Sequence, residues 1–130
     1  MDECQQGGCF CGDIRYQITG KPVLQLFCYC SDCRATTGSD AWAGYMVKIP
    51  DFRLLTGAPT VYEKTSKEGR VVKQHFCGKC GSSLWGETEF GLMSVGAGGL
   101  DDTSVFNPTK KVFVDDAPHW ARIPEELEEM

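Results

Sequence analysis

The 130-residue sequence contains no apolar run that approaches the roughly 20 residues a membrane-spanning helix needs. Its first residues, Met1 to Gln6, lack both the basic region and the apolar stretch of a secretory signal. Basic residues are also in deficit, since 13 Lys and Arg stand against 18 Asp and Glu, and the formal net charge is −5. We therefore expect a cytoplasmic location, and neither a membrane nor a nucleic-acid backbone as the main partner.

Low-complexity linkers, internal repeats and shifts in composition are missing as well, so residues 1–130 are expected to form a single domain. Helical periodicity is scarce. Short apolar segments separated by Gly, Pro, Asp and Ser predict a mainly β protein instead. The expected strands are 13–19, 23–29, 41–49, 52–55, 61–65, 70–76, 83–86, 93–96 and 112–114.

Local signals mark one hairpin and two short helices. The dipeptide Glu68-Gly69 is expected to form a hairpin turn between two of the strands. Residues 31–36 could form a short helix with Ser31 as its cap. Pro124, followed by acidic residues, predicts a C-terminal helix over about 124–130, because proline is favoured at the first helical position.

The eight cysteines are the most informative residues in the sequence. In a reducing cytoplasm they are not expected to form structural disulfides. Cysteines spaced Cys-x-Cys cannot easily bond to each other and are more typical of metal-ligand pairs. The alternative, a secreted disulfide framework whose signal peptide has been removed, stays open at this point.

Four cysteines form two pairs far apart in the sequence, Cys9/Cys11 and Cys77/Cys80, which we call the tetrad. Both pairs are flanked by glycine, which permits tight turns and lets backbone N–H groups point at sulfur. Four thiolates match the tetrahedral coordination of a structural zinc ion. Because the pairs are distant, zinc binding should close a large loop and contribute to folding stability.

Three further cysteines, Cys28, Cys30 and Cys33, follow a Cys-x-Cys-x-x-Cys pattern, and we call them the triplet. Three thiolates leave a tetrahedral metal one ligand short, and an open position distinguishes catalytic zinc from structural zinc. A soft three-sulfur site would suit the thiolate of a substrate as the fourth ligand, deprotonated by the metal. Arg34 and Lys48 could anchor a carboxylate on such a substrate.

Other interpretations of the triplet remain open. Its thiols could stay free of metal or form a transient disulfide, and Cys4 or His75 could supply a fourth ligand that closes a second structural site. In the simpler interpretation, Cys4 is an exposed thiol, His75 is an ordinary strand residue, and His119 lies in a packed surface turn.

Three segments together resemble one known family: residues 7–16 (GGCFCGDIRY), 28–34 (CYCSDCR) and 76–85 (FCGKCGSSLW). This is the glutathione-dependent formaldehyde-activating enzyme family, which also includes centromere protein V. The resemblance implies a β-tent fold of mostly antiparallel sheets, structural zinc at the tetrad, and catalytic zinc held by the triplet. In the family's named reaction, glutathione adds to formaldehyde to give S-hydroxymethylglutathione, formally a carbon–sulfur lyase reaction run in reverse.

The leading hypothesis is therefore a zinc-dependent enzyme, similar to a carbon–sulfur lyase, that acts on the adduct of a small thiol. Glutathione with formaldehyde or another aldehyde is the pair that the resemblance implies. The first alternative is a non-catalytic zinc-binding interaction module in which only the tetrad is filled. The second alternative is a redox enzyme that uses the triplet cysteines.

Overall fold

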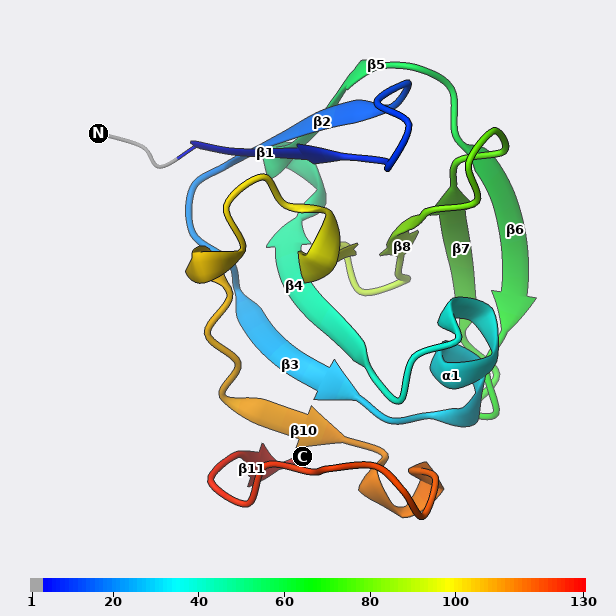
Figure 1. Cartoon of the computed structure of the whole chain (residues 1–130), viewed down its shortest axis with the longest axis vertical. Coiled ribbons are helices and arrows are strands. Elements are labelled where there is room, and N and C mark those ends of the chain that lie inside the picture. Colours follow the sequence, from blue (N-terminus) through cyan, green and yellow to red (C-terminus); the bar gives the residue numbers. More distant parts are fainter. Residues whose placement is uncertain (1–3) are drawn as a thin grey trace.

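The computed structural model describes residues 4–130, which form mainly short strands (Figure 1). The strands are β1 (Cys4–Gly8), β2 (Arg15–Thr19), β3 (Leu24–Cys28), β4 (Trp42–Lys48), β5 (Phe52–Thr56), β6 (Thr60–Thr65), β7 (Val71–Phe76), β8 (Ser83–Glu87), β9 (Leu92–Gly96), β10 (Lys110–Val112) and β11 (Glu128–Glu129). The helices are α1 (Ser31–Thr37) and the 3-10 turns η1 (Ile49–Asp51), η2 (Ala97–Gly99), η3 (Thr103–Val105) and η4 (Val114–Asp116). Within the described range, no helix has the length and apolar character to cross a membrane.

The strands form two sheets, which confirms the mainly β prediction. The smaller sheet is antiparallel with the order β1-β2-β5, and in Figure 1 it lies across one end of the larger sheet. The larger sheet has the order β11-β10-β3-β4-β9-β8-β7-β6. Its pairs from β3 to β6 are antiparallel, whereas β10 pairs in parallel with β3 and β11, so this sheet is mixed.

The core lies between the two sheets. The strand register places Tyr45, Val95 and Trp85 side by side on one face of the larger sheet, and each is at most 4% exposed. Tyr16 and Phe52 of the smaller sheet cover them, with ring centroids 5.7 and 4.6 Å from that of Trp85. Because alternate strand residues point to opposite faces, the neighbours of this row face away from the core.

Every strand expected from the sequence overlaps an observed strand, and the hairpin is confirmed. The β6–β7 turn closes with a backbone hydrogen bond from Ser66 to Arg70 of 2.8 Å, and Gly69 has a φ of +79°. The two strands that the sequence analysis missed are β1 and β11.

The predicted C-terminal helix over 124–130 is wrong. After a turn, Glu128 and Glu129 form β11, which pairs in parallel with β10. In a helix, the glutamates at 125, 126, 128 and 129 would repel each other at three- and four-residue spacings. In the extended form, Glu128 instead makes an ion pair of 2.8 Å with Lys110, and its backbone is paired with the sheet edge.

Candidate metal centres

The tetrad lies in two loops of the same backbone design, one joining β1 to β2 and the other joining β7 to β8. The N–H of Cys9 donates to the carbonyl of Ile14 at 3.1 Å, and that of Cys77 donates to the carbonyl of Ser82 at 2.9 Å. The glycine after the second cysteine of each loop has a φ of +84° or +82°. Glycine adopts this left-handed conformation without steric cost, which explains the flanking glycines seen in the sequence.

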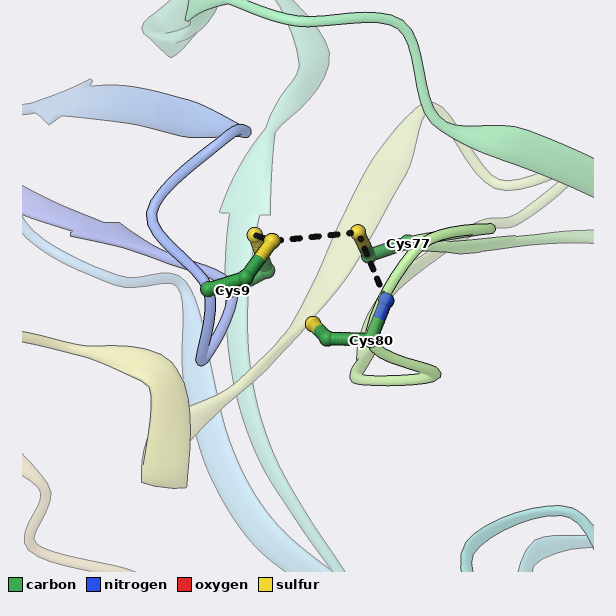
Figure 2. A group of neighbouring side chains, drawn as sticks. Cys9, Cys77 and Cys80 are labelled. Atoms are coloured by element: carbon green, nitrogen blue, oxygen red, sulfur yellow. Dashed lines mark hydrogen bonds between the residues drawn. The ribbon is translucent and has the colours of Figure 1, made fainter.

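The four sulfurs converge between these loops. All of them lie within 4.8 Å of one another, and Figure 2 shows Cys9, Cys77 and Cys80 pointing toward a common centre. The Sγ atom of Cys11 is 3.6 Å from that of Cys9 and 3.8 Å from that of Cys77. Zinc–sulfur bonds of about 2.3 Å in a tetrahedron would separate the sulfurs by about 3.8 Å. The tetrad therefore fits a zinc ion in its donor set and in its spacing.

Neighbouring donors favour the thiolate form of Cys9 and Cys80, whereas contacts with the other three sulfurs raise the pKa of Cys11 to about 12. The N–H of Ile14 lies 3.3 Å from the Cys9 sulfur, and the N–H of Cys80 lies 3.4 Å from the Cys77 sulfur. The Ser82 hydroxyl lies 3.1 Å from the sulfur of Cys80, and this hydrogen bond lowers the pKa of the Cys80 thiol to about 5. Thiolates are the metal-binding form of cysteine, so these hydrogen bonds favour the binding of a metal cation between the loops.

Two polar contacts also join the loops directly. The N–H of Phe10 donates to the Ser82 hydroxyl at 3.0 Å. Lys79, which lies between the second pair of cysteines, makes an ion pair of 3.3 Å with Asp13 of the first loop. The two loops are therefore held near each other by protein contacts as well as by any shared ion.

The triplet lies where β3 meets α1. Cys28 ends the strand, Cys30 precedes the helix, and Cys33 lies in its first turn. The Cys30 sulfur accepts a hydrogen bond of 3.3 Å from the N–H of Cys33, so Cys30 is the helix cap and the prediction of Ser31 is wrong. The cap position requires an extended backbone and a side-chain acceptor, and Cys30 supplies both.

The triplet sulfurs are also close enough to share an ion. All three lie within 4.8 Å of one another, and those of Cys28 and Cys33 are 3.6 Å apart. Hydrogen bonds from the thiols of Cys28 and Cys33 lower the pKa of Cys30. The same contact with Cys30 raises the pKa of Cys28 to about 11. Cys30 is thus the first thiolate of the group, and the other two would lose their protons when a metal binds.

No other His, Cys, Asp or Glu of residues 4–130 joins the triplet. Cys4 is exposed at the start of β1, and the ring of His75 stacks on Trp85 with a centroid separation of 4.9 Å. Neither residue therefore completes a second four-ligand site. The triplet presents three sulfurs, which is one fewer than a tetrahedral ion accepts.

A cavity of about 780 Å³ adjoins the triplet, and its volume is typical of small-molecule sites. Its walls come mainly from α1, from the β6–β7 hairpin and from other strands of the larger sheet, with Phe113, Asp116 and Met130 of the C-terminal segment. Trp42, the cross-strand partner of Cys28, lies on this wall. Lys64 of β6 also lines it and makes an ion pair of 3.0 Å with Asp32 of α1, which fixes the helix against the hairpin.

The residues expected to anchor a carboxylate lie elsewhere. Arg34 and Lys48 are not among the residues that line the cavity. The guanidinium of Arg34 donates to the carbonyl of Asp116 at 2.8 Å, and Lys48 is exposed at the end of β4. His119 lies in an exposed turn, where its ring contacts that of Trp120 at 5.2 Å, as the simpler interpretation predicted.

The fold and these sites define a cysteine-rich β protein with two clusters of metal-ligand type, one of four sulfurs and one of three beside a cavity. The model of one protein family, described as "Glutathione-dependent formaldehyde-activating enzyme", matches residues 4–116. The chain belongs to this family, as the motifs had indicated.

Two known proteins are similar to the chain. A protein of Halomonas elongata named "Putative glutathione-dependent formaldehyde-activating enzyme" is 32% identical over 84 residues, which cover 62% of this chain and 54% of that protein. The chain thus spans about half the length of this curated relative. A protein of Rhodobacter sphaeroides of known crystal structure matches with a TM-score of 0.59 and 22% identity, over 74% of this chain and 87% of that one. At this identity, the likeness concerns the fold alone.

Proposed function

We propose that this protein is a zinc-dependent enzyme that adds a small thiol to an aldehyde, or cleaves the resulting adduct, at the triplet. In this proposal the tetrad holds a structural zinc ion and the triplet holds a catalytic one. Membership of the glutathione-dependent formaldehyde-activating enzyme family supports a thiol such as glutathione and an aldehyde as the two reactants.

One observation carries the proposal. The three sulfurs of the triplet converge at the edge of a ligand-sized cavity, and no fourth protein ligand joins them among residues 4–130. A purely structural zinc site would be closed by four protein ligands, as the geometry of the tetrad allows. The difference between four ligands in the tetrad and three in the triplet therefore supports a structural role for the first cluster and a catalytic role for the second.

A zinc ion held by three thiolates supplies a fourth position at which a thiol sulfur is bound and deprotonated. The protein's part is to hold that position against the cavity, with Cys30 and Cys33 fixed by the first turn of α1. In the addition, a bond forms between the thiol sulfur and the aldehyde carbon, and the thiol's proton ends on the former carbonyl oxygen. The reverse reaction breaks that bond and returns the proton to sulfur, so neither direction needs an oxidant or a reductant.

The test is to count zinc ions per chain by native mass spectrometry, on protein purified without chelator. The wild-type chain is expected to carry two ions, and a triple variant with Cys28, Cys30 and Cys33 changed to Ser is expected to carry one. The triple variant should also lose acceleration of the reaction between glutathione and an aldehyde. Cys4→Ser is the matched control, because Cys4 is exposed and lies outside both clusters.

Two outcomes would overturn the proposal. One zinc ion in both proteins, even after zinc and glutathione are added, would indicate a non-catalytic module in which only the tetrad is filled. A disulfide within the triplet that forms and opens during turnover of a redox substrate would instead indicate a cysteine redox enzyme.

A further inference from the structure

The main wall of the cavity is the face of the larger sheet that points away from the core. The strand register places six cavity-lining residues in one row across six strands: Leu24, Met46, Ser94, Gly86, Gln74 and Tyr62. Leu26, Val72 and Leu92 extend this wall in neighbouring positions. Apolar side chains therefore form much of the surface that a ligand at the triplet would meet.

Two glycines lie in the middle of this face of the sheet. Gly86 has no side chain, and a Cβ atom there would lie 3.2 Å from a methyl carbon of Val72. Gly44 of β4 does not line the cavity, but it is similarly crowded, since a Cβ atom would lie 3.1 Å from the Ser94 hydroxyl. The cavity volume of about 780 Å³ leaves room beside a thiol for a carbonyl compound far larger than a one-carbon aldehyde, which needs little more space than a water molecule, about 30 Å³.

Several polar groups on the walls are already paired with one another. The indole N–H of Trp42 donates to the Ser94 hydroxyl at 2.9 Å. The three basic residues that line the cavity each lie within 3.3 Å of a carboxylate oxygen, in the pairs Lys64–Asp32, Lys67–Asp116 and Arg70–Glu68. None of these three cations lies in the row of sheet residues named above, so that wall is better suited to an apolar group than to a charged one.

We propose that the carbonyl substrate carries an apolar substituent of about six to ten carbon atoms, which packs against Leu24, Met46 and Val72. The substrate class is then a medium-chain or aromatic aldehyde, or its thiol adduct, in place of formaldehyde. This inference rests on the proposed function for the chemistry at the triplet. The reacting bonds are those given above: sulfur–carbon bond formation with transfer of the thiol proton to oxygen, and its reversal.

The first test measures binding without chemistry, on the zinc-loaded protein. Ethanol, 1-butanol, 1-hexanol and 1-octanol serve as unreactive probes, titrated while amide signals of Met46 and Val72 are followed by NMR. Affinity should rise about fourfold per added methylene up to the length that the cavity holds, because each methylene leaves water. An affinity independent of chain length, or shifts confined to other residues, would overturn the inference.

A pair of neighbouring substitutions provides the control. Leu24→Trp fills the cavity and should weaken 1-hexanol binding at least tenfold. Val23→Trp makes the same kind of change one residue earlier, at a side chain that is 52% exposed and does not line the cavity, and should leave binding unchanged. Equal loss in both variants would contradict the location of the site. The alcohol series on the wild-type protein tests the inference even if one variant fails to fold.

Turnover then separates the two proposals. Glutathione serves as the thiol, and the measured quantity is the ratio of the catalysed to the uncatalysed rate of adduct formation. This ratio is expected to be at least tenfold larger for hexanal than for formaldehyde. Acceleration of formaldehyde alone, together with no dependence on alcohol length, would leave the proposed function standing and overturn the apolar substrate. Chain-length-dependent binding with no acceleration of any aldehyde would keep the apolar site and overturn the proposed function.

Discussion

Two features fix the position of Trp42 beside the triplet: a hydrogen bond to Ser94, and the absence of a side chain on Gly96, which leaves space for the indole ring. Its indole N–H is bonded to Ser94, and its six-membered ring lies over Gly96. A Cβ atom on Gly96 would come within 2.7 Å of that ring, which is closer than real Cβ contacts allow. At this position, glycine is required by packing.

We therefore predict that Gly96→Ala lowers the free energy of unfolding by about 1–3 kcal/mol, because Trp42 must leave its rotamer or the strand must shift. Gly98→Ala is the control, since a Cβ atom there meets nothing within 4 Å, and its effect should stay within about 0.5 kcal/mol. Urea denaturation of the two variants measures the difference. Equal stability of the two variants would mean that Trp42 does not lie against Gly96 in solution.

Among single residues, the sequence predicted the cysteine groups better than their surroundings. The spacing of the seven clustered cysteines reflects local loop and helix geometry, and the structure brings each predicted group together. Cap preference pointed to Ser31 because serine is common at that position, whereas the acceptor is the sulfur of Cys30. The ion pair between Lys64 and Asp32 joins strand β6 to helix α1, and no local sequence pattern predicts it.

Among the elements, α1 has the most direct connection to the proposed chemistry, because it carries Cys33 and is capped by Cys30. The helix ends at Gly38, which has a φ of +73° and whose N–H donates to the carbonyl of Arg34 at 2.8 Å. Space is not the constraint there, since a Cβ atom on Gly38 would meet nothing within 4 Å. The left-handed backbone alone makes glycine favourable.

Gly38→Ala should accordingly destabilise the protein by about 1 kcal/mol, the cost of placing a Cβ atom in a left-handed conformation. Gly38→Asn should lose less, because asparagine tolerates this conformation better than alanine does. The comparison can be made by urea denaturation of the zinc-loaded proteins. If alanine proved as stable as glycine, the left-handed end of α1 would not persist in solution.

Strand positions were predictable where a short apolar segment is bounded by turn residues, as in β6 and β7. Two strands were missed for physical reasons that differ. β1 has the sequence CQQGG, which offers little apolar pattern, and it is a strand because its backbone pairs with β2. β11 exists through two residues paired with β10, a partner far away in the sequence, so local helix signals at Pro124 gave the wrong result.

For the whole molecule, the tetrad connects the two sheets. Its first loop joins β1 to β2 of the smaller sheet, and its second loop joins β7 to β8 of the larger one. The sequence indicated that one ion could bind both loops, but it did not indicate which strands belong to which sheet. That division depends on pairings such as β2 with β5, which span loops whose patterns do not specify a partner.

Removing the metal should therefore weaken the whole fold. If the tetrad holds zinc, it closes a loop of 66 residues between Cys11 and Cys77, and constraining a loop of this length is worth on the order of 4 kcal/mol. We expect chelator-treated protein, and Cys77→Ser, to unfold at clearly lower urea concentrations than zinc-loaded wild type. The triple serine variant of the triplet should lose less, because its cysteines lie within one short segment. An unchanged urea midpoint after zinc removal would refute the structural role.

The separation of the two cysteine groups along the chain also sets an order in time during synthesis. The triplet is complete once Cys33 has left the ribosome, and its ligands come from adjacent residues. Cys77 follows Cys11 by 66 positions, so the first half of the tetrad must wait about 3 to 13 seconds for it at ordinary translation rates. During that interval Cys9 and Cys11 are nascent thiols without their partners, so the triplet is able to bind an ion earlier in synthesis than the tetrad is.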